Sequence, residues 1–173
     1  MIINGKSLLE LAPIKNMLTT KVIENGVSHG LGEAGYDIRI KQEVRFSPSL
    51  ERPGQMVVVV VEPDRTLNTR ANYSRFALAS AIEEFQMPTN LAGIVHDKSS
   101  WARRGLSVFN TVIEPGWHGF LTLELVYHGE AELHIPAGSA IAQVVFTETS
   151  DRRAYSGKYQ HQEDRPTPAI YQD

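Results

Sequence analysis

Two hydroxyl side chains and three cations fall within seven positions, in the stretch Lys-Ser-Ser-Trp-Ala-Arg-Arg at residues 98–104. Ser99 or Ser100 can cap a single helical turn and so direct backbone N–H groups toward an anion. Lys98, Arg103 and Arg104 would supply the positive charge that suits a phosphate. A solvated turn with a capped helix would carry the same residues, so this stretch alone favours the two interpretations equally.

A carboxylate, a rigid turn and an aromatic ring follow one another in the stretch Glu-Pro-Gly-Trp at residues 114–117. Proline fixes its own φ and glycine permits a positive φ, so Glu114 and Trp117 would hold defined positions at the mouth of a sheet. Such a pair would be suited to binding a deoxyribose. A carboxylate in a turn is otherwise simply solvated.

A third stretch, Phe-Leu-Thr-Leu-Glu-Leu-Val-Tyr at residues 120–127, has the alternation of a strand. That alternation predicts Thr122, Glu124 and Val126 on one face and the leucines at 121, 123 and 125 on the other. If the face that holds Glu124 is covered, burial raises the pKa of its carboxyl, which can then transfer protons near neutral pH. If the face is open, Glu124 is an ordinary outward-facing residue.

The sequence offers no set of side chains typical of a zinc site. Its six histidines stand on different predicted elements, and none pairs with another at a ligand spacing near a carboxylate. It contains no cysteine, which excludes disulfides, thiolate nucleophiles and the Cys-rich ligand set of the familiar zinc-dependent nucleobase deaminases. A hydrolytic reaction by this chain would therefore activate water without zinc.

The elements that must position these residues are predicted to be strands. Short runs rich in β-branched and aromatic residues alternate with Gly, Pro and Asn. With no long amphipathic helix between the runs, the pattern favours an antiparallel sandwich or jelly roll over a βαβ fold. The expected strands cover residues 36–46, 55–62, 75–82, 91–96, 106–113, 120–127, 132–135 and 140–146.

The two ends of the chain differ from this strand-rich middle. Ser7 would cap a short helix with an apolar side, and Pro13 argues for an early stop. From about residue 150 the chain is polar, carries Pro166 and Pro168, and has isolated aromatic residues. We expect this tail to become ordered by docking on the rest of the protein.

Composition limits the possible partners. With 173 residues, 42% of them hydrophobic and 21% charged, we expect a single domain over residues 1–173. A net charge of −3 without a block of like charges disfavours binding to a nucleic acid polymer. The longest apolar run, Met56 to Val61, is too short to span a bilayer, and no signal segment is apparent, so we expect a cytoplasmic protein with no membrane partner.

Taken in chain order, these stretches resemble the dCTP deaminase branch of the dUTPase-like superfamily. The likeness is carried by residues 35–40 (Gly-Tyr-Asp-Ile-Arg-Ile), 98–106, 113–119, 122–125, 138–146 and 157–162, and so covers most of the chain beyond residue 35. It implies an all-β, dUTPase-like jelly-roll or β-clip fold with a short N-terminal helix and a C-terminal lid at about residues 150–173. It also implies a homotrimer with active sites between subunits.

The resemblance implies hydrolytic deamination of dCTP, or of a close deoxycytidine nucleotide, to dUTP. Glu124, ten positions after Glu114, matches the family's spacing between the sugar-side acid and the catalytic glutamate, and Arg103 stands at the position of the catalytic arginine. Ser99 would help to position the water, and magnesium would be held mainly by the triphosphate. The implied substrate-binding residues are Lys98, Ser99, Ser100, Arg103, Glu114, Trp117, Thr122, Tyr155, Lys158 and Gln162.

Three departures from the family pattern leave alternatives open. Lys98 replaces the usual arginine, Glu114 replaces the usual aspartate, and the loop at residues 109–112 is closer in length to that of a dUTPase. They leave two products open, namely dUTP, or dUMP and diphosphate if the enzyme is bifunctional. They also leave open whether the base is plain or modified cytosine. The competing hypotheses are a dUTPase or related nucleotide diphosphatase that uses Glu114, and a non-catalytic member of the fold that binds nucleotides or a protein.

Overall fold

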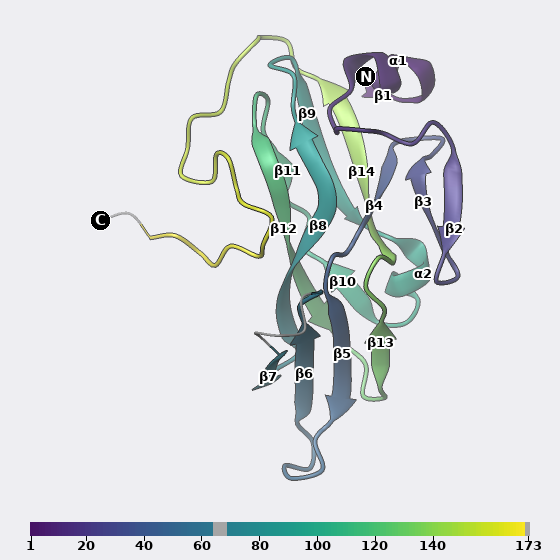
Figure 1. Ribbon diagram of the computed structural model, residues 1–173, viewed down its shortest axis with the longest axis vertical. Coiled ribbons are helices and arrows are strands. Elements are labelled where there is room, and N and C mark those ends of the chain that lie inside the picture. Colours follow the sequence, from purple (N-terminus) through teal and green to yellow (C-terminus); the bar gives the residue numbers. More distant parts are fainter. Residues whose placement is uncertain (64–68, 172–173) are drawn as a thin grey trace.

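The computed structural model describes residues 1–63 and 69–171, and most elements of this part of the chain are β-strands (Figure 1). Helices within it are limited to α1 (Gly5–Leu11) and α2 (Ser99–Ala102). The strands are β1 (Ile2–Ile3), β2 (Lys21–Glu24), β3 (Val27–Leu31), β4 (Tyr36–Arg39), β5 (Glu43–Pro48), β6 (Met56–Val61), β7 (Thr69–Tyr73), β8 (Phe76–Gln86), β9 (Leu91–Asp97), β10 (Leu106–Val108), β11 (Val112–Ile113), β12 (His118–Tyr127), β13 (Leu133–Ile135) and β14 (Ala140–Glu148).

The strands form three antiparallel sheets. The largest has the order β11-β9-β14-β4-β3-β2, with β1 also paired to β14. A second has the order β10-β12-β8, and a third has the order β13-β5-β6-β7. The predicted all-β, antiparallel fold class is confirmed.

One apolar cluster joins the three sheets. Phe146 of the first sheet, Phe85 of the second and Phe46 of the third are fully buried in it. The Phe46 ring lies 5.3 Å from that of Tyr127 on β12. Because buried aromatic rings remove large apolar areas from water, this cluster holds β12 firmly against its neighbours.

Two predicted strands are in fact pairs of strands. Residues 36–46 divide into β4 and β5, which belong to different sheets. The fully buried Gln42 lies at the crossing, where its side-chain oxygen accepts a hydrogen bond from Ser80 N at 2.8 Å. Residues 106–113 divide into β10 and β11, because Asp97 accepts a hydrogen bond from Val108 N at 2.7 Å and Phe109 N donates to Glu124 O. The chain thus leaves β10 for another sheet.

The first 35 residues contain more structure than the sequence analysis expected. The helix begins at Gly5 with Asn4 as its N-cap, so the prediction that Ser7 caps it was wrong. β2 and β3 form a hairpin whose turn residues, Asn25 and Gly26, both have positive φ. An Asn-Gly pair is the typical signal for such a turn, and it was present in the sequence.

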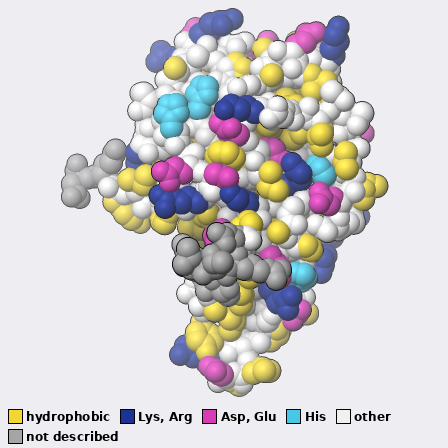
Figure 2. Space-filling model, viewed as in Figure 1, with side chains coloured by type: hydrophobic (Ala, Val, Ile, Leu, Met, Phe, Trp, Pro, Cys, Tyr) yellow, Lys and Arg dark blue, Asp and Glu magenta, His cyan; other side chains and the backbone are white. Residues whose placement is uncertain are grey.

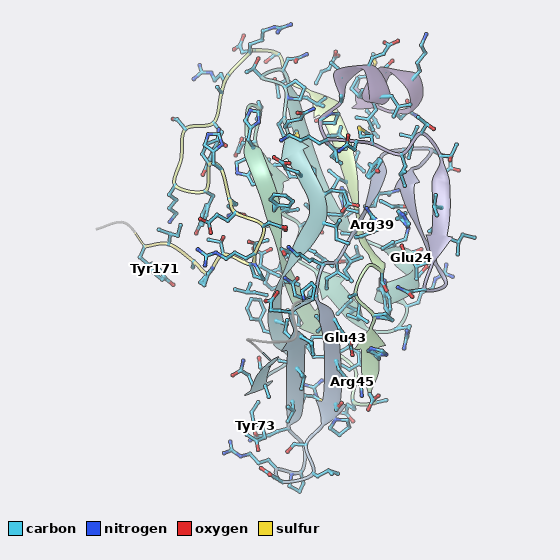
Figure 3. All side chains as sticks on the ribbon, in the orientation of Figure 1. Glu24, Arg39, Glu43, Arg45, Tyr73 and Tyr171 are labelled. Atoms are coloured by element: carbon cyan, nitrogen blue, oxygen red, sulfur yellow. The ribbon has the colours of Figure 1, made fainter. Side chains whose placement is uncertain are left out.

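Charges are mixed on the face drawn in Figure 2, where acidic and basic side chains lie interspersed without a large area of one sign. Figure 3 places Glu24 of β2 on the far side of the molecule from Tyr171, near the end of the chain. None of the helices in the described part of the chain is long and apolar enough to cross a membrane.

Candidate active site

A cavity of about 490 Å³ lies between β8, β11, β12 and the C-terminal segment, which we define as residues 150–171. Figure 1 shows this segment, in yellow, running beside β11 and β12. Apolar walls come from side chains such as Phe76, Leu78 and Val112. Six of the predicted site residues line the cavity: Glu114, Trp117, Thr122, Glu124, Tyr155 and Gln162.

Glu124 is held in the cavity wall by the alternation of β12. Its neighbours Leu123 and Leu125 point into the apolar core, with 1% and 0% of their surfaces exposed, so Glu124 lies on the opposite face. The glutamate is half-buried, and its Oε2 atom has no hydrogen-bond partner among the described residues. Burial raises the pKa of the Glu124 carboxyl above the usual range of a glutamate. A carboxyl in this state is a stronger base than a solvated glutamate, and it can both accept and return a proton.

The pairing of β12 with β8 is irregular at one point. Between Phe120 and Thr122, two steps along β12 face four steps along β8, from Glu84 to Ser80, so the extra residues lie in β8. Leu121 lies beside this irregularity and lines the cavity together with Thr122 and Glu124. It also packs against the apolar core, as predicted for the leucine face, so it contacts both the core and the cavity.

The turn before β12 has a fixed shape. Trp117 N donates to Glu114 O at 3.1 Å, and Gly116 between them has a positive φ of 72°. The Trp117 ring is buried, 6.0 Å from the ring of Phe85, whereas the Glu114 side chain is exposed at the cavity wall. The turn thus presents a carboxylate and an indole at the same cavity.

The C-terminal segment docks on the start of β12 through its backbone. Phe120 N donates to Gln162 O at 3.1 Å, and His161 N donates to His118 O at 2.9 Å. Gly119 forms a parallel bridge with Gln162, and a Cβ atom placed on this glycine would lie 2.6 Å from Gln162 N. The segment can approach this closely only because residue 119 has no side chain.

Side-chain contacts hold the segment over the cavity. Thr122 Oγ1 accepts a hydrogen bond from Thr167 N at 3.0 Å and donates to Gln162 Oε1 at 3.4 Å. Tyr155 N donates to Pro115 O at 2.8 Å. Lys158 lies outside the cavity wall, where its Nζ atom donates to Ile170 O.

The stretch at residues 98–104 lies apart from this cavity. Figure 1 shows α2 on the opposite side of the sheets from the C-terminal segment. Ser99, Ser100 and Arg103 are exposed there, and neither they nor Lys98 lines the cavity. Within one chain, the residues predicted to bind the phosphates are therefore separated from the residues predicted to bind the base and the sugar.

Lys98 begins α2 in a way that the sequence analysis did not predict. Lys98 itself is the N-cap residue and no side chain caps the turn, so the prediction that Ser99 or Ser100 caps it was wrong. The Lys98 ammonium pairs with the carboxylate of Asp37 at 2.7 Å, and both side chains are largely buried. This partner from β4 fixes where the turn begins and neutralises the charge of Lys98.

Sequence reasoning missed several cavity residues. Tyr159, Thr167 and Ala169 reach the cavity from the C-terminal segment, and Phe76 and Leu78 reach it from β8. The tail prediction noted the isolated aromatic residues, but the part of β12 on which they dock depends on contacts between distant parts of the chain. Within residues 1–63 and 69–171, no group of three or more His, Asp or Glu side chains could hold a metal ion.

The fold is the one found in dUTPases. The solved structure of the Staphylococcus bacteriophage 80alpha dUTPase aligns with a TM-score of 0.51 and 14% sequence identity, over 91% of this chain and 95% of that one. At this level of identity the likeness shows the fold alone. It confirms the predicted dUTPase-like fold class.

Sequence comparison gives a narrower assignment. A family model described as dCTP deaminase-like matches residues 8–149. The dCTP deaminase of Campylobacter jejuni subsp. jejuni serotype O:2 is 34% identical over 177 residues, covering 95% of this chain and 94% of that protein. The dCTP deaminase of Sulfurovum sp. is 34% identical over 183 residues, with 97% and 94% covered. The chain belongs to the dCTP deaminase-like family, which confirms the resemblance drawn from its motifs.

Proposed function

We propose that this protein hydrolyses the exocyclic amino group of dCTP, or of a close deoxycytidine nucleotide, to give dUTP and ammonia. The observation that carries the proposal is the half-buried Glu124 carboxyl in the cavity wall, with one oxygen that no described group satisfies. A buried unpartnered carboxylate oxygen is costly, and a water or substrate group in the cavity would satisfy it. The dCTP deaminases at 34% identity support the same reaction.

In the proposed mechanism Glu124 removes a proton from water and passes it to N3 of cytosine, as the resulting hydroxide adds to C4. Glu124 then moves the proton of the C4 hydroxyl to the exocyclic nitrogen, the C4–N bond breaks, and ammonia leaves as the C4 carbonyl forms. One residue serves as base and then as acid, which its raised pKa suits. Trp117 and Glu114 would hold the deoxyribose from the adjacent turn.

The triphosphate contacts require a second subunit in this proposal. Ser99, Ser100 and Arg103 are exposed on the far side of the sheets from the cavity, where a neighbouring copy of the chain could meet them. In a homotrimer each α2 would face the cavity of the next subunit, and magnesium would accompany the triphosphate that these residues bind. Because Lys98 is already paired with Asp37, its main contribution would be to hold α2 in place. The C-terminal segment, with Tyr155, Lys158 and Gln162, would close over the bound nucleotide.

A second activity at the same cavity is favoured by one observation. The exposed carboxylate of Glu114 lines the same cavity as Glu124. It could act as base for water attacking the α-phosphate, which would convert dUTP to dUMP and diphosphate. The substrates in both cases are free nucleotides, so we place the reaction in the cytoplasm, away from membranes and nucleic acid polymers.

The test is to incubate the full chain and its Glu124→Gln and Glu114→Gln variants with dCTP and magnesium, and in separate reactions with dUTP and magnesium, and to measure ammonia, dUTP, dUMP and diphosphate. We expect ammonia from the native protein and a loss of about 100-fold or more in Glu124→Gln, because the amide cannot take up the proton. Production of dUMP that disappears in Glu114→Gln would mark the bifunctional enzyme. No ammonia from any protein, with dUMP formed from dUTP by native chain and Glu124→Gln alike, would replace deamination by a dUTPase.

A further inference from the structure

The side chain of Gln160 uses both of its N–H groups and its carbonyl oxygen in hydrogen bonds to backbone groups around the cavity. Its Nε2 atom donates to Gly116 O at 2.9 Å and to Tyr155 O at 3.0 Å. Its Oε1 atom accepts a hydrogen bond from His118 N at 2.8 Å. One half-buried amide thus joins the turn before β12, the first residue of β12 and the C-terminal segment.

Only an amide meets these three requirements at this length. The two N–H groups of glutamine satisfy two carbonyl oxygens, and its carbonyl satisfies one N–H. A glutamate in the same place would still accept from His118 N, but it would set a negatively charged oxygen against the carbonyls of Gly116 and Tyr155. The site is therefore selective for the chemistry of glutamine and not merely for its size.

The residues that Gln160 bonds are the neighbours of cavity residues. Gly116 and His118 flank Trp117, whose indole N–H donates to Tyr159 O at 2.6 Å, directly before Gln160 in the chain. Two positions later, Gln162 reaches Thr122 in the cavity wall. The position of Gln160 therefore sets how the Trp117 turn and the closing segment lie relative to one another.

We propose that Gln160 is a positioning residue for the deamination, one that acts through Trp117 and the C-terminal segment without touching the nucleotide. It couples docking of the segment to the geometry of the turn that carries Glu114 and Trp117. The inference rests on the proposed function for its kinetic consequence. Its structural part, that Gln160 docks the segment, is independent of turnover.

The experiment compares three variants of the full chain, Gln160→Ala, Gln160→Glu and the matched control Gln86→Ala. Gln86 also donates from its side chain to a backbone carbonyl, that of Ala12 at 3.0 Å, but toward the N-terminal region. The measurements are kcat and KM for dCTP, the equilibrium affinity for dCTP, the thermal unfolding midpoint, and the rate of trypsin cleavage after Lys158 without nucleotide.

For Gln160→Ala we expect KM and the dissociation constant to rise about tenfold, because hydrogen bonds that close the site over the nucleotide are lost. We expect kcat to change by less than about threefold, since Glu124 is untouched. Cleavage after Lys158 should be several-fold faster, with an unfolding midpoint like that of Gln86→Ala. Gln160→Glu should be at least as impaired as Gln160→Ala.

The proposal is overturned if Gln160→Ala matches Gln86→Ala in KM and in cleavage rate, or if Gln160→Glu behaves as the native chain. It is also overturned if kcat and the unfolding midpoint fall together while KM stays constant, since that describes general damage. Should the native chain neither bind nor deaminate dCTP, the proposed function fails, and the cleavage rates alone decide whether Gln160 docks the segment.

Discussion

Glu124 loses part of its contact with water when the chain folds, and its pKa rises because burial penalises the charged form. In the unfolded chain the carboxyl has an ordinary pKa of about 4.3. Below that pH both states are protonated, and the contribution of the neutral side chain to stability is fully present. As the pH rises through the folded-state pKa, the folded protein must bury a charge, and this stability is lost.

Replacing Glu124 by glutamine should therefore stabilise the protein at neutral pH. Glutamine keeps the shape and stays neutral, so the unfolding midpoint of Glu124→Gln should equal that of the native chain near pH 4. It should exceed the native value by a few degrees at pH 8. Thermal unfolding followed by circular dichroism from pH 4 to pH 8 measures the difference. A difference that is constant across this range, or that favours the native chain at pH 8, would contradict a raised pKa.

At the scale of single residues, the sequence analysis correctly placed side chains whose orientation follows from local alternation. The period of two placed Thr122 and Glu124 together on a face of β12, and both line the cavity. It did not show that Leu121 reaches the cavity as well as the core, because the irregular pairing of β12 with β8 beside this residue involves strands that are far apart in the sequence. Gln160 lies in the stretch 157–162 that carried part of the family resemblance, but it received no role of its own, since its bonds go to three backbone groups that come together only in the folded chain.

Among the elements, β12 and the C-terminal segment depend on one another through Gly119. This glycine has a φ of 136°, and a Cβ atom there would lie 2.6 Å from Gln162 N and 2.7 Å from Gln162 O. Both atoms belong to backbone that is already hydrogen-bonded to Phe120 or held in the parallel bridge. A side chain at residue 119 would therefore have to push the segment away.

The Gly119→Ala variant should undock the C-terminal segment while leaving the sheets intact. We expect trypsin cleavage after Lys158 to become about tenfold faster or more, because local opening governs cleavage when reclosing is fast. Gly54→Ala is the matched control, since Gly54 has a positive φ of 82° and nothing within 4 Å of the added Cβ. If both variants were cleaved at the same increased rate, the strain of an alanine at positive φ, and not contact with Gln162, would explain the faster cleavage.

The hardest boundaries to predict were those at which the chain passes from one sheet to another. The stretch at residues 36–46 looks continuous in sequence, yet the chain changes sheets at Gln42, whose buried amide bonds to Ser80 on another strand. The order of the strands within each sheet also brings together residues that are far apart in the chain, as in the pairing of β1 with β14. Composition and alternation carry no information about either.

At the scale of the whole molecule, the distance between α2 and the cavity leads to a prediction about assembly. If each site takes Glu124 from one subunit and Arg103 from the next, Glu124→Gln and Arg103→Ala should each be inactive alone. When the two are mixed in equal amounts, unfolded and refolded together, random assembly gives about one quarter of the sites a complete set of residues. Ammonia release from dCTP should return to roughly that share of native activity.

Mixtures that stay inactive would argue that both residues act from one subunit. Full activity of Arg103→Ala alone would argue that Arg103 has no part in the reaction. Refolding each variant by itself supplies the control for losses during refolding. A molar-mass measurement by light scattering on the native chain tests the trimer directly. The sequence suggested this assembly only through family resemblance, since no pattern within one chain identifies a surface that meets its own copy.

The docked C-terminal segment also has a kinetic consequence. Residues 155–169 cover one side of the cavity, and the backbone bonds from Phe120 and His161 hold them there. If this segment closes further over a bound nucleotide, entry of the nucleotide and escape of the product would pass through the same opening motion. The turnover rate would then be limited by how often the C-terminal segment opens. A more viscous solution would lower the turnover rate even if every step at Glu124 were fast.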